Sequence, residues 1–289
     1  MPRLWMQKPK LRNGWKAKVG LCHCGSMLEG IETGYEERYD FPHREAPPER
    51  VYMLATVPRT GSTYVSHLLW RSGGLGAPLE YLNFLPGSPY ASAHGQPERQ
   101  TALWRAALRR RTSPNGVFGV KCFSLQLREL QRDNPSLLLD VFATMFPKSG
   151  QARIVRLKRR DRVAHAISYA RAALSGVWRK EQETPSMTTV DYSDRAVDDA
   201  RLLLDRQDAD WDALFDEMGI EQLTLWYEDV VAEPAASVLR VASYLDVSVD
   251  PAAAVTIPEV ERQALEDGRR WQERYSARAA SKQSPGGNG

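Results

Sequence analysis

The clearest structural pattern in the chain is VYMLATVPRTGSTYVSHLLWRSG, residues 51–73. Its first seven residues are mostly apolar and rich in strand formers, and PRTGST follows them at once. In the residues after this loop, apolar side chains recur at helical spacing. The pattern therefore predicts a buried strand, a tight loop and a helix.

Three more strands are expected along the chain, in GVFGVKCFSL (116–125), ARIVRLK (152–158) and LTLWYEDV (223–230). Helices are expected at 163–174, with Asp161 as the N-terminal cap, and at 193–217, 235–245 and 258–280. Strands that alternate with helices indicate parallel βαβ units. We therefore expect a doubly wound α/β fold that binds its ligands at the carboxyl ends of the strands.

Composition divides the chain into a long central region and two different ends. The first eighteen residues hold six Lys and Arg and no acid, and residues 41–50 are the Pro-rich FPHREAPPER. We expect residues 1–50 to be a partly flexible extension or strap, 51–280 to be the functional domain, and 281–289 to be a disordered tail. The basic start fits weak contact with a membrane surface or an acidic partner, although a run of this kind is more often a mobile tail.

Charge and cysteine content exclude several classes of protein. Lys and Arg number 39 and Asp and Glu number 36, a balance too even for a nucleic-acid-binding protein. The odd, low count of Cys22, Cys24 and Cys122 argues against a disulfide-stapled secreted domain and favours the cytoplasm. No apolar run is long enough to cross a bilayer. Cys22 and Cys24 lack the spacing and the second pair of a zinc site, so no metal is expected there.

The loop after the first strand has the composition of an anion site. Gly61 allows a tight turn, the N–H groups at a helix start point at an anion, and Arg59 supplies a planar charge. A nucleotide triphosphatase would need G-x-x-x-x-G-K-[ST], and no lysine precedes Ser62. An ordinary strand-to-helix turn with Gly and Ser as caps remains an alternative.

A second basic cluster follows the expected strand at 152–158. Arg159 and Arg160 end that strand, and Ser168 lies about two helical turns beyond Asp161. These side chains converge only if the chain folds back around a ligand. Two anion sites at neighbouring strand ends suit a nucleotide phosphorylated at both ends, whereas a solvated basic strand end is the alternative.

Four stretches together resemble the bacterial PAPS-dependent carbohydrate sulfotransferases, of which mycobacterial trehalose 2-sulfotransferase is typical (PAPS is 3′-phosphoadenosine 5′-phosphosulfate). They are PRTGSTYVSHLLWRSGGLGAPLEYLNF (58–84), NGVFGVKCFSLQ (115–126), KRRDRVAHAISYARAALSGVW (158–178) and VERQALEDGRRWQERY (260–275). The resemblance implies a P-loop-like, three-layer α/β fold with a central parallel sheet flanked by helices. It also implies PAPS as donor, PAP as product, no metal, and a homodimer with its acceptor pocket near the subunit interface.

The resemblance also implies roles for individual residues. The 5′-phosphosulfate loop is expected at Arg59, Thr60, Gly61, Ser62 and Thr63. The 3′-phosphate is expected at Arg159 and Ser168, but Arg160 stands where the family has a proline, so either arginine fits.

Outside the two phosphate sites, Glu80 matches the family's general base, and Lys121 matches a strand lysine whose role stays open. Arg262 and Gln263 are expected to close the nucleotide site.

The acceptor is not visible in the sequence, so a sugar, a glycolipid and a glycosylated small molecule all stay open. Two other functions also fit the pattern. One is a kinase-like enzyme that binds ATP and magnesium, and the other is a PAPS- or PAP-binding protein without turnover.

Overall fold

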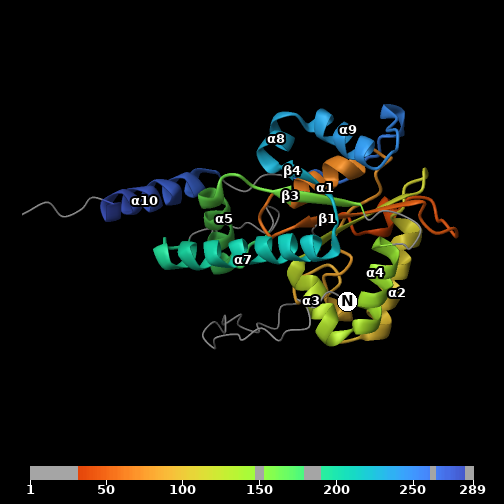
Figure 1. Ribbon diagram of the computed structural model, residues 1–289, viewed down its shortest axis with the longest axis horizontal. Helices are drawn as coiled ribbons and strands as arrows, with labels where there is room; N and C mark the ends of the chain where they lie inside the picture. Colours follow the sequence, from red (N-terminus) through yellow and green to blue (C-terminus); the bar gives the residue numbers. More distant parts are fainter. Residues whose placement is uncertain (1–31, 147–152, 179–189, 261–264, 284–289) are drawn as a thin grey trace, which may run out of the picture.

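The computed structural model describes residues 32–146, 153–178, 190–260 and 265–283, and its centre is a four-stranded parallel sheet (Figure 1). The strand order is β2-β1-β3-β4, and every pairing is parallel. The strands are β1 (Arg50–Thr56), β2 (Val117–Phe123), β3 (Ile154–Lys158) and β4 (Gln222–Trp226).

β1 and β2 are mostly apolar and buried because both faces of the sheet are covered there. In β1, Tyr52 and Leu54 face one hydrophobic cluster, and Met53 and Ala55 face another. This division follows from the alternation of side chains along a strand.

Helices form one layer on each face of the sheet (Figure 1). The first layer, packed on Tyr52 and Leu54, contains α1 (Ser62–Arg71), α8 (Tyr227–Ala232) and α9 (Pro234–Tyr244). The opposite layer contains α2 (Pro97–Arg110), α3 (Ser124–Asp133), α4 (Pro135–Met145) and α7 (Asp194–Met218). The predicted P-loop-like, three-layer α/β class is therefore confirmed.

Two helices extend the structure at the side of the sheet (Figure 1). They are α5 (Arg162–Ser175) and α10 (Leu265–Gln283). Asp161 caps α5 by accepting a hydrogen bond from the N–H of Ala164 at 2.8 Å, as predicted. Trp271 of α10 is buried in a cluster with residues of α5 and α7. Short 3-10 turns occur at Glu37–Tyr39, Ala91–Ala93 and Pro251–Ala253.

Several expected boundaries were wrong. The strand predicted at 223–230 ends at Trp226, and YED opens α8 instead, because acidic residues in a first helical turn favour the positive helix N-terminus. The helix predicted at 258–280 is described only from Leu265 and runs to Gln283, three residues into the segment assigned to the tail. Residues 258–260 are not helical.

The helices α2, α3 and α4 were not predicted from the sequence. Two of them carry recognisable start signals, since Pro97 and Pro135 occupy the first turn, where proline is favoured. Asn134 also caps α4 by accepting a hydrogen bond from the N–H of Leu137. For α2 and α4, the sequence signal that predicts a helix therefore lies at the helix start and not in the spacing of the apolar residues.

Residues 32–49, which we call the strap, precede β1 and pack on the domain. Phe41 belongs to the cluster beneath the sheet, and its N–H donates to the carbonyl of Arg110 at 2.8 Å. Tyr39 packs edge-on against Trp70 of α1, with ring centroids 6.1 Å apart. The basic first eighteen residues lie outside the described residues, and the division into three regions stays a prediction.

Candidate active site

The loop between β1 and α1 leaves the carboxyl end of an interior strand, between β2 and β3. Two residues of this loop, separated by Thr60, have a positive φ: Arg59 has φ +66° and Gly61 has φ +90°. A Cβ atom on Gly61 would stand 2.2 Å from the ring of Tyr227. Gly61 is therefore required both for its backbone conformation and for the close packing of Tyr227.

This loop is held by its own Thr60 and by side chains of two helices. Thr60 Oγ1 donates to the carbonyl of Val57 at 2.5 Å, and Trp211 Nε1 of α7 donates to the carbonyl of Thr56 at 2.8 Å. His165 of α5 donates from Nε2 to the carbonyl of Pro58 at 2.8 Å. Because α1 starts at Ser62, the fixed loop presents the N-terminus of a helix, an arrangement suited to an anion.

His165 is neutral in this position. Burial lowers its pKa to about 4, and the hydrogen bond to Pro58 offsets only part of that effect. Among the described residues, its Nδ1 atom has no hydrogen-bond partner. The imidazole therefore acts as a structural donor beneath the loop and carries its proton on Nε2.

The structure separates the two arginines that the sequence left equivalent. The guanidinium of Arg159 lies 5.4 Å from the ring centroid of Tyr227, and Nη1 donates to the carbonyl of Arg59 at 3.3 Å. Its Nε atom is buried without a hydrogen-bond partner among the described residues. Arg160 instead forms a bidentate ion pair with Asp229 on the outside, with its side chain 49% exposed. Arg159 is thus the one directed at the loop.

Ser168 contacts the loop through Arg59. The Nε atom of Arg59 donates to Ser168 Oγ at 3.1 Å, and its Nη1 atom donates to the carbonyl of Trp178. Ser168 thus contacts Arg59 of the first expected anion site, and its convergence with the strand-end arginines around a ligand stays a prediction. Arg159 contacts the backbone carbonyl of Arg59, and Ser168 contacts the guanidinium of Arg59.

Glu80 and Lys121 form an ion pair next to the loop. Lys121 Nζ lies 2.9 Å from Glu80 Oε1 and donates to Thr63 Oγ1 at 3.2 Å. The side chain of Lys121 is 3% exposed and that of Glu80 is 16% exposed. Lys121 therefore lies between Thr63, in the first turn of α1, and the carboxylate of Glu80.

Three residues that the sequence reasoning missed also hold Glu80. Asn83 Nδ2 and Gln126 Nε2 donate to Glu80 Oε2 at 2.9 and 3.2 Å. The backbone N–H of Glu80 donates to Tyr35 Oη of the strap at 2.8 Å. Asn83 and Gln126 lie inside stretches that carried the family resemblance, but no sequence pattern points to Tyr35.

Some predicted features fall outside the site that the structure describes. Arg262 and Gln263 lie outside the described residues, so their role stays a prediction.

The described residues contain no group of three or more His, Cys, Asp or Glu side chains that could hold a metal ion. Among the described helices, none combines the length and the apolar character that crossing a bilayer requires.

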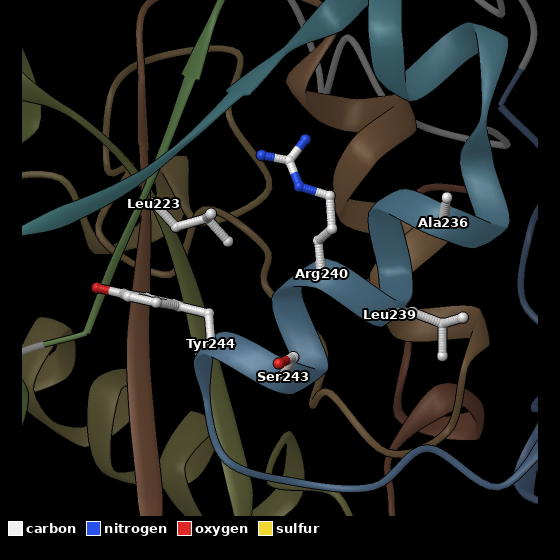
Figure 2. Close-up of a pocket in the computed structure, with 6 residues that line it drawn as sticks. All are labelled: Leu223, Ala236, Leu239, Arg240, Ser243 and Tyr244. Atoms are coloured by element: carbon white, nitrogen blue, oxygen red, sulfur yellow. The ribbon is translucent and has the colours of Figure 1, made fainter.

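A surface hollow lies elsewhere, between α9 and the edge strand β4 (Figure 2). Tyr244, which lines it, accepts a hydrogen bond from the N–H of Ile154 at the start of β3. The anion loop lies at the opposite, carboxyl end of the strands, so this hollow is separate from the site. Its lining residues are Leu223, Ala236, Leu239, Arg240, Ser243 and Tyr244.

Comparison with known protein families gives one match that covers most of the chain. Residues 51–278 match the family described as Stf0 sulphotransferase. Trehalose 2-sulfotransferase of Mycobacterium tuberculosis (strain ATCC 35801 / TMC 107 / Erdman) is 28% identical over 265 residues, which cover 80% of this chain and 96% of that protein. Trehalose 2-sulfotransferase of Mycolicibacterium smegmatis is 25% identical over 257 residues, covering 78% and 93%.

The solved structures that align with this chain are less similar to it in sequence. A sulfotransferase from Alicyclobacillus acidocaldarius is 15% identical, with a TM-score of 0.42 and coverage of 81% of this chain and 94% of that one. Retinol dehydratase in complex with retinol and PAP is 14% identical, with a TM-score of 0.35 and coverage of 82% and 80%.

Proposed function

Because this chain belongs to the Stf0 sulphotransferase family and is a sulfotransferase, we propose that it transfers the sulfuryl group of PAPS to a hydroxyl of a carbohydrate or glycosylated acceptor. The family resemblance read from the sequence is confirmed. The proposal of this donor and this type of acceptor rests mainly on one observation. Lys121 contacts both Thr63, which follows the anion loop, and the carboxylate of Glu80, and so links the loop to the proposed base.

The donor would be gripped at its two ends. The 5′-phosphosulfate would lie against the loop N–H groups, with Arg59, Thr60, Gly61, Ser62 and Thr63 around it. The 3′-phosphate would be bound by Arg159 and Ser168. We favour Arg159 over Arg160 because Arg159 is directed at the loop and has a buried Nε donor, whereas Asp229 already engages Arg160.

The reaction would be an in-line displacement at sulfur. A bond forms between the acceptor oxygen and sulfur, the bond from sulfur to the bridging oxygen of the 5′-phosphate breaks, and Glu80 accepts the hydroxyl proton. Arg59 and the loop N–H groups would stabilise the charge on the departing PAP. Because a sulfuryl group carries less charge than a phosphoryl group, we propose that no metal takes part.

Lys121 would fix the orientation of the base. Its ammonium holds Oε1 of Glu80, and Asn83 and Gln126 hold Oε2, so the carboxylate has little freedom to rotate. A base held at one orientation can meet the acceptor hydroxyl without a further conformational search. Since Lys121 also contacts Thr63, it would keep the base in register with the donor loop.

The acceptor and the assembly are proposed from the relatives and from the sequence resemblance. Two relatives are named for sulfation of trehalose at position 2, so trehalose is the first acceptor to test. A glycolipid and a glycosylated small molecule are the next candidates. We also propose a homodimer, as the sequence resemblance implies, that works in the cytoplasm, which the low and odd cysteine count favours.

The proposal is tested by following radiolabelled sulfate from PAPS to trehalose and to a panel of glycosylated acceptors. We expect a labelled product, and we expect PAP to raise the thermal midpoint of the protein more than ATP with magnesium does. A larger shift with ATP and magnesium would favour the kinase-like alternative. PAP binding without labelled product from any acceptor would favour a binding protein without turnover.

A further inference from the structure

One buried arginine makes four contacts with the strap. Arg111 donates from Nη1 to the carbonyl of Gly34 at 2.8 Å and from Nη2 to the carbonyls of Tyr35 and Glu36 at 3.0 and 3.2 Å. Its Nε atom also lies 2.8 Å from a carboxylate oxygen of Asp40. Arg111 is 4% exposed, and hydrogen bonds to a buried charge are strong. The backbone around Tyr35 is therefore held in one conformation.

The side chain of Tyr35 is held as firmly as its backbone. Its ring packs edge-on against Tyr90 and Tyr81, with centroids 5.3 and 6.4 Å away. Burial raises the pKa of Tyr90 to about 12, so this neighbour stays an uncharged phenol at neutral pH. The hydroxyl of Tyr35 consequently has a defined position, and there it accepts the hydrogen bond from the N–H of Glu80.

Glu80 itself lies on a segment without regular structure. The residue before it, Leu79, makes an isolated parallel bridge to Val120, and its carbonyl accepts from the N–H of Lys121 at 3.0 Å. These contacts fix the backbone on the side of β2. The contact with Tyr35 fixes the next peptide on the side of the strap.

We propose that Tyr35 is a positioning residue that sets the backbone of the general base Glu80, so that the strap is a working part of the acceptor side of the site. This inference rests on the proposed function, because it assigns Tyr35 a role through Glu80. A phenylalanine at position 35 would keep the ring packing but leave the N–H of Glu80 without its acceptor. The peptide would turn to find another acceptor and carry the carboxylate with it.

The expected effect is on turnover rather than on donor binding. A misplacement of about 1 Å can lower a rate by about 100-fold, so we expect Tyr35→Phe to lower kcat by about tenfold or more. The affinity for PAP should change by less than about twofold, because donor contacts come from the loop and α5. Tyr39→Phe is the matched control, since Tyr39 lies on the same strap and, within the part of the chain that the structure describes, its hydroxyl donates only to Glu32.

The experiment compares wild type with Tyr35→Phe, Tyr39→Phe, Glu80→Gln and the double variant Tyr35→Phe/Glu80→Gln. PAP release from PAPS is measured with trehalose present. Sugar and water both lose a proton when they attack, so the rate reports on the base with either acceptor. Calorimetric titration with PAP counts folded sites, and each rate is divided by that count.

Support requires three results together: a tenfold loss in Tyr35→Phe, none in Tyr39→Phe, and no additional loss when Tyr35→Phe is added to Glu80→Gln. Wild-type turnover in Tyr35→Phe, loss of PAP binding, or an equal loss in both backgrounds would each overturn the role of Tyr35. If Glu80→Gln alone keeps full turnover, the base assignment in the proposed function fails first. The two failures are therefore distinguishable.

Discussion

The proposed donor side and the proposed acceptor side of the site are built in different ways. The donor loop connects a strand to a helix of the central sheet, and side chains of α5 and α7 hold it from below. Glu80 lies on an irregular segment, and its position depends on side chains from the strap, β2 and α3. The geometry of the proposed anion site thus follows from the regular fold, whereas the placement of one carboxylate requires contacts gathered from several distant segments.

Gly61→Ala gives the largest expected effect and tests the donor side. A positive φ costs a residue with a Cβ about 1–2 kcal/mol, and overpacking against Tyr227 adds about 1–3 kcal/mol. If that distortion reaches the loop N–H groups, PAP affinity should fall by about 100-fold. Titration calorimetry and urea denaturation measure the two losses.

Gly219→Ala is the control for this substitution. Gly219 has φ +62°, but an added Cβ would meet no atom within 4 Å. Gly219→Ala should therefore lower the free energy of unfolding only by the cost of the positive φ, and its PAP affinity should stay unchanged. Equal PAP affinities for the two variants would show that the packing of Tyr227 on Gly61 does not shape the loop.

Glu80→Gln tests the acceptor side with the next largest effect. A general base contributes about 10²–10⁴-fold, so we expect turnover to fall by about 100-fold and at least by about tenfold. PAP affinity should stay within about twofold, since the amide keeps the shape of the side chain. Labelled-sulfate transfer measures the rate, and Glu49→Gln, which changes an exposed carboxylate near β1, should match wild type. Unchanged turnover in Glu80→Gln would remove the base from the acceptor side.

Arg159→Ala against Arg160→Ala sharpens the map of the donor side. Hydrogen bonds to charged groups contribute about 1.5–3 kcal/mol, so Arg159→Ala should weaken PAP by about 10–100-fold. Binding of adenosine 5′-monophosphate should change much less, because it lacks the 3′-phosphate. Arg160→Ala should alter PAP affinity by about twofold or less, since it breaks only an exposed pair with Asp229. Equal losses for both nucleotides in Arg159→Ala would place the 3′-phosphate elsewhere.

The smallest expected effect concerns the support of the donor loop and depends on pH. The pKa of His165 is about 4 in the folded state, against an ordinary value of 6.5. The unfolded chain therefore binds more protons between these values, and stability falls as the pH drops. From pH 7 to pH 5 we expect this residue to remove roughly 2 kcal/mol from the free energy of unfolding.

Urea denaturation at the two pH values checks this expectation. His165→Asn should flatten the pH dependence, whereas His43→Asn on the exposed part of the strap should leave it as in wild type. An equally steep decline in His165→Asn would assign the pH dependence to other groups.

The difference between the two sides also explains how far the sequence could be interpreted. Strand, loop and helix around Gly61 follow from local patterns, because buried parallel strands and glycine turns leave a signature within a few residues. The choice between Arg159 and Arg160 did not follow, since it depends on Tyr227 and Asp229, which belong to another element. Tyr35 could not be found at all, because its contact with Glu80 arises only when separate loops pack together.

The contact between Gly61 and Tyr227 has a consequence for how the protein is made. The loop leaves the ribosome early, yet the ring that packs on it follows β4, the last strand of the sheet. Nascent chains that stop before this strand would therefore lack a finished nucleotide cradle, however well their first helices have formed. Ligand affinity should then appear abruptly during synthesis, as the final edge of the sheet docks.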